Sequence, residues 1–180
     1  MQSNIKKPDI VLVDDHMIFR QGIKAIINFE DLGTVIGEAS NGKEFIEMMS
    51  IKNPDLVLMD IDMPGMNGFE ATKRALEINS DLKIIVFTIF DNEECFKKMV
   101  ELGAKGFILK TSGLNELEMA IEKVMDGGQY FSNEFSSPPK DDYQDNSSHG
   151  ISKNEEGIHS TNNKMLFFPW MSSRQNFTNI

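Results

Sequence analysis

The sequence predicts an α/β fold in which a parallel five-stranded sheet is covered by helices on both faces. Over the first 130 residues, short apolar segments alternate with amphipathic segments. Nearly continuous apolar segments of about five residues are typical of strands that are buried on both faces. Strands that alternate regularly with helices are typical of a parallel sheet.

The expected strands cover residues 9–13, 34–38, 55–59, 83–87 and 106–109. Between them, apolar residues recur at helical spacing, for example Ile23, Ile26 and Ile27 within 18–28, and a similar pattern predicts a helix over 42–50. Asn41 and Asn115 occupy positions where the N-cap residue of a helix is expected.

Polar residues follow or end four of the five strands. Asp14 and Asp15 follow the first strand, Asp60 follows the third, Thr88 ends the fourth and Lys110 ends the fifth. Ligands of such sheets bind outside the carboxyl ends of the strands. We therefore expect these five side chains to converge on one edge of the sheet.

Three neighbouring carboxylates repel one another and need a cation, and a set of oxygen ligands suits Mg²⁺ better than zinc. A carboxylate can also act as a nucleophile that forms an aspartyl-phosphate. Phosphoryl transfer then depends on positioning and on neutralising charge. Lys110 is expected to neutralise phosphoryl oxygens, and the Thr88 hydroxyl to donate to one of them.

The same five positions carry a family resemblance. Together with the segments DIDMPGMNG at 60–68 and GAKGFILK at 103–110, they resemble the response-regulator receiver domain of two-component signalling. The resemblance extends from residue 9 to about 131. It implies a flavodoxin-like fold with strand order 2-1-3-4-5.

By this resemblance, Asp60 accepts a phosphoryl group from a sensor histidine kinase. Asp14, Asp15 and Asp60 would hold Mg²⁺, with the backbone carbonyl of Asp62 as a further ligand, while Thr88 and Lys110 act on the phosphoryl group. The chain would then catalyse only its own phosphorylation and slow autodephosphorylation.

The resemblance also implies a two-state surface. Thr88 and Phe107 would be the switch residues, with homodimerisation on phosphorylation as a further expectation. Asp-Asp-His at 14–16 and Gly-Phe-Ile-Leu-Lys-Thr at 106–111 are similar to the branch with a LuxR-type helix-turn-helix output. Thr111 departs from many receivers, which have Pro there.

Other interpretations stay open for single residues. Asp14 alone would suit the N-cap of the first helix, and His16 a helix start. Cys95 would be a small apolar contact. Asp62 either tunes the lifetime of the phosphoryl group or is a solvated carboxylate. Because Asp62 lies two residues after Asp60, a hydrolase related to aspartyl-phosphate phosphatases is a further alternative.

The composition changes near residue 133. Residues 1–135 contain 14 of the 18 basic and 23 of the 28 acidic residues, whereas 136–180 contain eight Ser and six Asn. We expect a receiver domain at 1–133, a linker at 134–150 and a truncated or degenerate output remnant at 151–180, predicted to be disordered. Pro169 breaks any helix there, and the apolar run 166–171 is either failed core or a docking peptide.

The net charge of −10 argues against binding nucleic acid over the whole surface. The alternative function is a DNA-binding transcriptional regulator of the LuxR-type branch, with its output module incomplete in this chain. DNA is therefore a partner only if an intact module exists. A single cysteine and the lack of an apolar run of about 18 residues predict a cytoplasmic protein outside the membrane.

Overall fold

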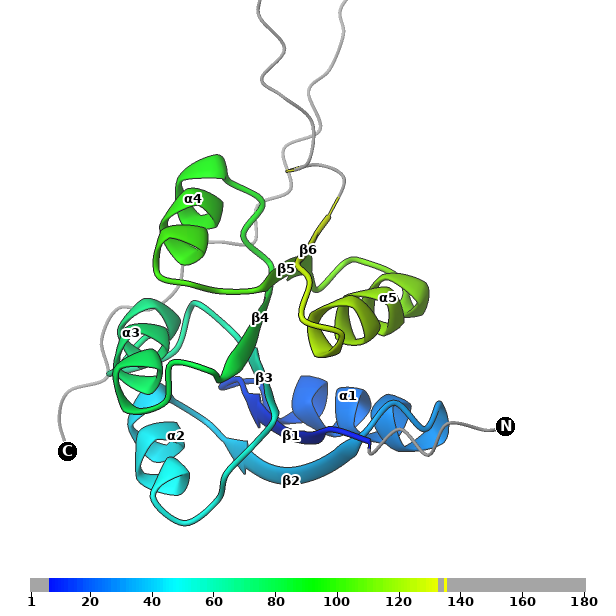
Figure 1. Ribbon diagram of the computed structural model, residues 1–180, viewed down its shortest axis with the longest axis horizontal. Helices are drawn as coiled ribbons and strands as arrows, with labels where there is room; N and C mark the ends of the chain where they lie inside the picture. Colours follow the sequence, from blue (N-terminus) through cyan, green and yellow to red (C-terminus); the bar gives the residue numbers. More distant parts are fainter. Residues whose placement is uncertain (1–6, 133–134, 136–180) are drawn as a thin grey trace, which may run out of the picture. The chain divides into compact units, whose positions relative to one another are not determined.

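The computed structural model describes residues 7–132 and 135, and within them one parallel sheet has the strand order β2-β1-β3-β4-β5-β6 (Figure 1). Helices cover both of its faces. The predicted α/β fold and the order 2-1-3-4-5 are thus confirmed, with a sixth strand added at one edge. The strands are β1 (Asp9–Val13), β2 (Thr34–Ala39), β3 (Leu56–Met59), β4 (Lys83–Thr88), β5 (Gly106–Leu109) and β6 (Tyr130–Phe131).

The helices among the described residues are α1 (Met17–Phe29), α2 (Gly42–Met49), α3 (Gly68–Ile78), α4 (Glu93–Glu101) and α5 (Leu114–Met125). Helices α1 and α5 lie on one face of the sheet, and α2, α3 and α4 lie on the other (Figure 1). In the described part of the chain, no helix combines the length and the hydropathy that crossing a bilayer requires.

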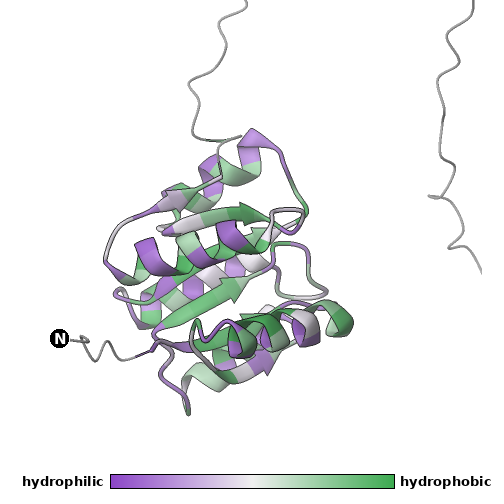
Figure 2. Cartoon of the chain, turned by 90° about the vertical axis from the view of Figure 1, so that its right-hand side faces the viewer, coloured by the Kyte–Doolittle hydropathy of each residue, from purple (hydrophilic) through white to green (hydrophobic). Residues whose placement is uncertain are grey.

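The central strands bury both of their faces. Along β1, Val11 and Val13 belong to the apolar cluster under α2, α3 and α4, while Ile10 and Leu12 belong to the cluster under α1 and α5. This alternation follows from the two-residue period of a strand. Figure 2 shows the result, with hydrophobic strands inside helices of mixed hydropathy.

The helix starts were predicted with mixed success. The side chain of Asn41 accepts a hydrogen bond from the backbone N–H of Glu44, so its predicted N-cap role is confirmed. The same role for Asn115 is wrong, because α5 begins at Leu114 and its N-cap is Gly113. Gly113 has an extended backbone and supplies no side-chain bond, which is why composition alone favoured the nearby asparagine.

The sixth strand was not predicted because two residues are too few for a recognisable pattern. It forms where the chain turns back after α5, as the N–H of Tyr130 donates to the Lys105 carbonyl and that of Ser132 to the Phe107 carbonyl, both at 3.0 Å. Glu116 of α5 accepts hydrogen bonds from the Tyr130 hydroxyl at 3.4 Å and the Ser132 hydroxyl at 3.1 Å. These bonds tie the edge strand to the last helix.

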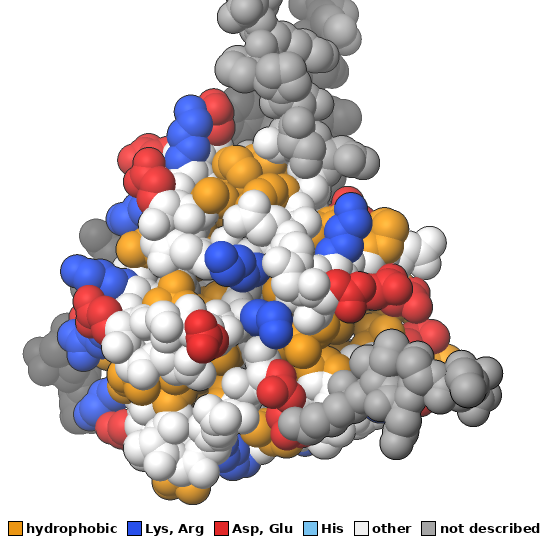
Figure 3. Space-filling view, in the orientation of Figure 1, with side chains coloured by type: hydrophobic (Ala, Val, Ile, Leu, Met, Phe, Trp, Pro, Cys, Tyr) orange, Lys and Arg blue, Asp and Glu red, His pale blue; other side chains and the backbone are white. Residues whose placement is uncertain are grey.

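The surface carries both charge signs. On the face shown in Figure 3, the Lys and Arg side chains of the described residues are interspersed with Asp and Glu rather than gathered in one patch. Apart from Phe135, the predicted linker at 134–150 lies outside the described residues, as does the predicted remnant at 151–180.

Candidate functional site

The site begins where β1 and β3 end. Val13 and Met59 are partners in the register of these adjacent strands, so the next residues, Asp14 and Asp60, emerge side by side. The backbone N–H of Asp60 donates to the Val13 carbonyl at 2.8 Å, and that of Asp14 to the Ala39 carbonyl at 3.0 Å. Continued sheet pairing therefore fixes the backbone of both residues, and Asp60 is only 3% and Asp14 only 5% exposed.

Lys110 neutralises part of this buried charge. Its Nζ lies 2.6 Å from Oδ2 of Asp14 and 2.6 Å from Oδ2 of Asp60. The backbone N–H of Lys110 donates to the Thr88 carbonyl at 2.7 Å, which anchors the residue after β5. One ammonium between two buried carboxylates leaves negative charge uncompensated, an arrangement that a bound cation would stabilise.

Asp15 and His16 complete the charged cluster. Ligand atoms of Asp14, Asp15, His16 and Asp60 all lie within 4.8 Å of one another. His16 is the N-cap residue of α1, so its predicted place at the helix start is confirmed and the N-cap interpretation of Asp14 is wrong. Asp14 Oδ1 instead accepts a hydrogen bond from the His16 N–H at 2.8 Å, and His16 Nδ1 lies 2.8 Å from Asp15 Oδ1.

The loop after Asp60 holds the carboxylate from the other side. Asp60 Oδ1 accepts from the Ile61 N–H at 2.7 Å. At Gly68, the first residue of α3, a Cβ atom would lie 2.1 Å from the Asp60 carbonyl oxygen, so only glycine permits this approach. Gly65 has φ +76°, a conformation that favours glycine. Asp62 is exposed in the same loop.

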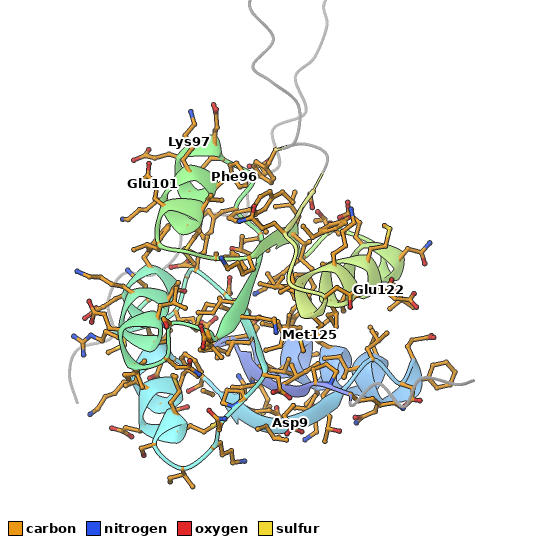
Figure 4. All side chains as sticks on the ribbon, viewed as in Figure 1. Asp9, Phe96, Lys97, Glu101, Glu122 and Met125 are labelled. Atoms are coloured by element: carbon orange, nitrogen blue, oxygen red, sulfur yellow. The ribbon has the colours of Figure 1, made fainter. Side chains whose placement is uncertain are left out.

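Thr88 and Phe107 are both completely buried. Thr88 Oγ1 accepts a long hydrogen bond of 3.4 Å from the Phe90 N–H. The Phe107 ring lies edge-on to Phe96 of α4 at 5.5 Å between centroids, and at 4.9 Å from Phe135. Phe96 points from α4 toward the strands, while Lys97 and Glu101 of the same helix point away (Figure 4).

Sequence reasoning missed two residues that contact this site. The ring of Phe19 in α1 lies 4.7 Å from Lys110 Nζ, a cation–π distance. Arg20 Nη1 donates to the backbone carbonyl of Asp14. The available signal was their position one turn into the helix that follows the acidic pair, from which a side chain can reach back over the loop.

Comparisons with known proteins agree with this geometry. Residues 10–122 match the response regulator receiver domain. The transcriptional regulatory protein DegU of Brevibacillus brevis is 37% identical over 129 residues, which are 72% of this chain and 55% of DegU. The nitrate/nitrite response regulator protein NarL of Escherichia coli K12 is 38% identical over 125 residues, 69% of this chain and 58% of NarL. The match thus spans just over half of each relative.

Solved structures give the same result. A two-component response regulator of the LuxR family from Aurantimonas sp. SI85-9A1 has a TM-score of 0.70 at 32% identity, covering 73% of this chain and 94% of that one. A CheY-like receiver domain protein from Methanospirillum hungatei, with a TM-score of 0.62 at 24% identity, covers 68% of this chain and 96% of that chain and shares the fold.

Proposed function

Because this chain belongs to the response regulator receiver domain family, we propose that it accepts a phosphoryl group on Asp60 from the phosphohistidine of a sensor histidine kinase. The observation that carries the proposal is the buried Asp60 carboxylate, which is paired with Lys110 and clustered with the acids of the β1–α1 loop. Catalysis by this chain is then limited to its own phosphorylation and slow autodephosphorylation.

The donor set fits Mg²⁺. Three carboxylates within reach of one point, with one neutralising lysine between them, form an oxygen-rich and negatively charged site. Asp14, Asp15 and Asp60 would hold the ion, with the Asp62 backbone carbonyl as a fourth group. When bound, Mg²⁺ supplies positive charge that offsets the developing charge of phosphoryl oxygens.

The chain's own residues have distinct tasks in the transfer. The Asp60 carboxylate forms an oxygen–phosphorus bond as the phosphorus–nitrogen bond of the phosphohistidine breaks and the imidazole leaves. The Ile61 N–H holds the other carboxylate oxygen in place. Lys110 then pairs with the phosphoryl group rather than with the bare carboxylate. Thr88 accepts one hydrogen bond, which leaves its hydroxyl proton for donation to a phosphoryl oxygen.

Signalling follows from the same residues. Thr88 would move toward the phosphoryl group, and Phe107, three residues before Lys110, would change its packing against Phe96 and Phe135. We propose that this shift favours a homodimer. We also propose that the chain acts in the cytoplasm, where ATP is available to a sensor kinase for forming its phosphohistidine.

The relatives favour a second function, DNA-binding regulation of transcription. DegU is a transcriptional regulatory protein and NarL is a nitrate/nitrite response regulator, and both align with the receiver part of this chain. DNA binding by this chain would require an output module beyond the receiver. A gel-shift assay with phosphorylated full-length protein tests it: saturable, sequence-selective binding supports DNA output, and its absence supports signalling through protein partners.

The phosphorylation proposal is tested with acetyl phosphate and Mg²⁺, followed by intact mass measurement. We expect one phosphoryl adduct in the wild type and in Asp62→Asn, and none in Asp60→Asn. Asp62 is a matched control because it is an exposed acid two residues away in the same loop. An adduct that survives Asp60→Asn would contradict the proposal.

A further inference from the structure

Arg20 is a largely buried cation that contacts the backbone of the site rather than its carboxylates. It lies one turn into α1, and its side chain folds back toward the β1–α1 loop, where Nη1 donates to the Asp14 carbonyl oxygen. The side chain is only 13% exposed. Removing a guanidinium from water costs free energy unless the group is paired and hydrogen-bonded. The partners of Arg20 therefore indicate why the side chain lies here.

The Glu38 carboxylate also holds Arg20 in this position. Glu38 at the end of β2 places Oε2 3.6 Å from Arg20 Nε, and its Oε1 accepts a hydrogen bond from Lys24 Nζ at 2.7 Å. The hydrogen bond from Lys24 lowers the pKa of Glu38 most, and the charge of Arg20 adds to the effect. Glu38 is therefore a charged anchor between two cations.

Arg20 is not optimised for that ion pair. Its Nε is buried without a hydrogen-bond partner among the described residues. Glu38 is also the only described carboxylate with which it forms an ion pair. Arg20 nevertheless lines the same pocket as Asp14 and Asp60. The guanidinium is thus placed for the Asp14 carbonyl.

That carbonyl belongs to the peptide unit between Asp14 and Asp15. A peptide unit is planar, so fixing its oxygen fixes the orientation of the whole unit and the direction in which the chain leaves toward Asp15. The N–H of Asp14 is already held by the Ala39 carbonyl at 3.0 Å. Asp14 is therefore restrained at both of its peptide units.

We propose that Arg20 is a positioning residue that holds the Asp14–Asp15 peptide unit so that both carboxylates face Mg²⁺. The proposal rests on the function given above, because it concerns the same metal site. Groups that orient metal ligands typically change affinity by about 10- to 100-fold when they are removed.

Electrostatic repulsion alone predicts the opposite change in Mg²⁺ affinity. A cation near a Mg²⁺ site repels the ion, so removing its charge would tighten Mg²⁺ binding if Arg20 had no positioning role. Weaker binding after neutralisation therefore separates positioning from electrostatics. Lys24→Met is the matched control, because it removes a charge from the same carboxylate, Glu38, without touching the Asp14 carbonyl.

The experiment measures the Mg²⁺ dissociation constant of the full chain by isothermal titration calorimetry at fixed ionic strength, without a phosphodonor. We expect about 10-fold weaker binding in Arg20→Met and unchanged or tighter binding in Lys24→Met. Arg20→Lys keeps the charge and most of the packing, and we expect an affinity between those of Arg20→Met and the wild type. Urea unfolding without Mg²⁺ checks that each variant is folded.

Affinity in Arg20→Met or Arg20→Lys equal to or tighter than that of the wild type would overturn the role of Arg20 and leave the proposed function intact. A wild type that does not bind Mg²⁺ would instead contradict the proposed metal site, and this inference with it. The Mg²⁺ concentration that gives the half-maximal phosphorylation rate is a separate readout. It should rise in Arg20→Met by about the same factor as the dissociation constant.

Discussion

Strand β5 joins two regions that are stabilised in different ways. At its carboxyl end, Lys110 is held between two buried carboxylates that carry more charge than it neutralises. Within the strand, Phe107 packs against aromatic rings from α4 and from the chain after α5. In the aromatic region the buried rings contact one another, whereas in the charged region a single lysine neutralises only one of two buried carboxylates. We therefore expect the aromatic region to contribute most to stability and the charged region to bind the ligand.

The largest expected effect comes from the aromatic region. Phe107→Ala should lower the free energy of unfolding by about 3–5 kcal/mol, because it removes a fully buried ring and leaves a cavity. Urea denaturation monitored by circular dichroism measures this. A loss below about 1 kcal/mol would mean that the aromatic contacts contribute little and would remove the contrast between the regions.

Two glycines sharpen the contrast at the level of the backbone. Gly68→Ala should cost about 1–3 kcal/mol and slow phosphorylation, because the new methyl group would displace the Asp60 carbonyl. Gly22→Ala in α1 has nothing within 4 Å of its Cβ and should stabilise the protein by about 0.5–1 kcal/mol. Equal effects in chemical denaturation would contradict the special role of Gly68.

Asp60→Asn should have a small effect on stability although Asp60 is nearly as buried as Phe107. Without Mg²⁺, we expect a change in unfolding free energy of under about 1 kcal/mol, because Asp14 still pairs with Lys110 and one buried charge disappears. The asparagine oxygen also still accepts from the Ile61 N–H. A loss as large as that of Phe107→Ala would show that the charged region is optimised for stability after all.

The smallest effect is a pH dependence at Glu38, beside the charged region. The pKa of Glu38 in the folded protein lies below its ordinary value of 4.5, chiefly because of the hydrogen bond from Lys24. The resulting stabilisation is complete above the ordinary pKa and is lost as pH falls through the lowered one. Lys24→Met should therefore flatten the stability profile below about pH 5, by under about 1 kcal/mol. An unchanged profile would contradict this pairing.

The parts of the fold that follow from local pattern could be predicted from the sequence. The strands β1 and β5 have the predicted bounds because their apolar runs end abruptly at charged residues or glycine. The sixth strand could not be predicted, since its two residues pair only after α5 has brought them to the edge of β5. The N-cap of α5 was missed because an extended glycine leaves no side-chain signal.

In the site, too, some residues follow from local sequence pattern and others depend on the folded structure. Asp14, Asp60 and Lys110 could be predicted to meet, because the ends of parallel strands lie at one edge of the sheet. Arg20 was not predicted, because its position one turn into α1 allows a contact with the preceding loop but does not specify that the partner is the Asp14 backbone carbonyl. Long-range contacts between side chains and the main chain are visible only once the fold is known.

Chemical trapping of the modified residue shows whether Asp60 carries the phosphoryl group. Protein phosphorylated with acetyl phosphate is reduced with borohydride, which converts an aspartyl-phosphate to homoserine, and is then mapped by peptide mass spectrometry. We predict homoserine at position 60 in the wild type and in Asp62→Asn, and none in protein treated without Mg²⁺. Homoserine at another aspartate, or no homoserine at position 60 in a protein that does gain the phosphoryl mass, would contradict phosphorylation of Asp60.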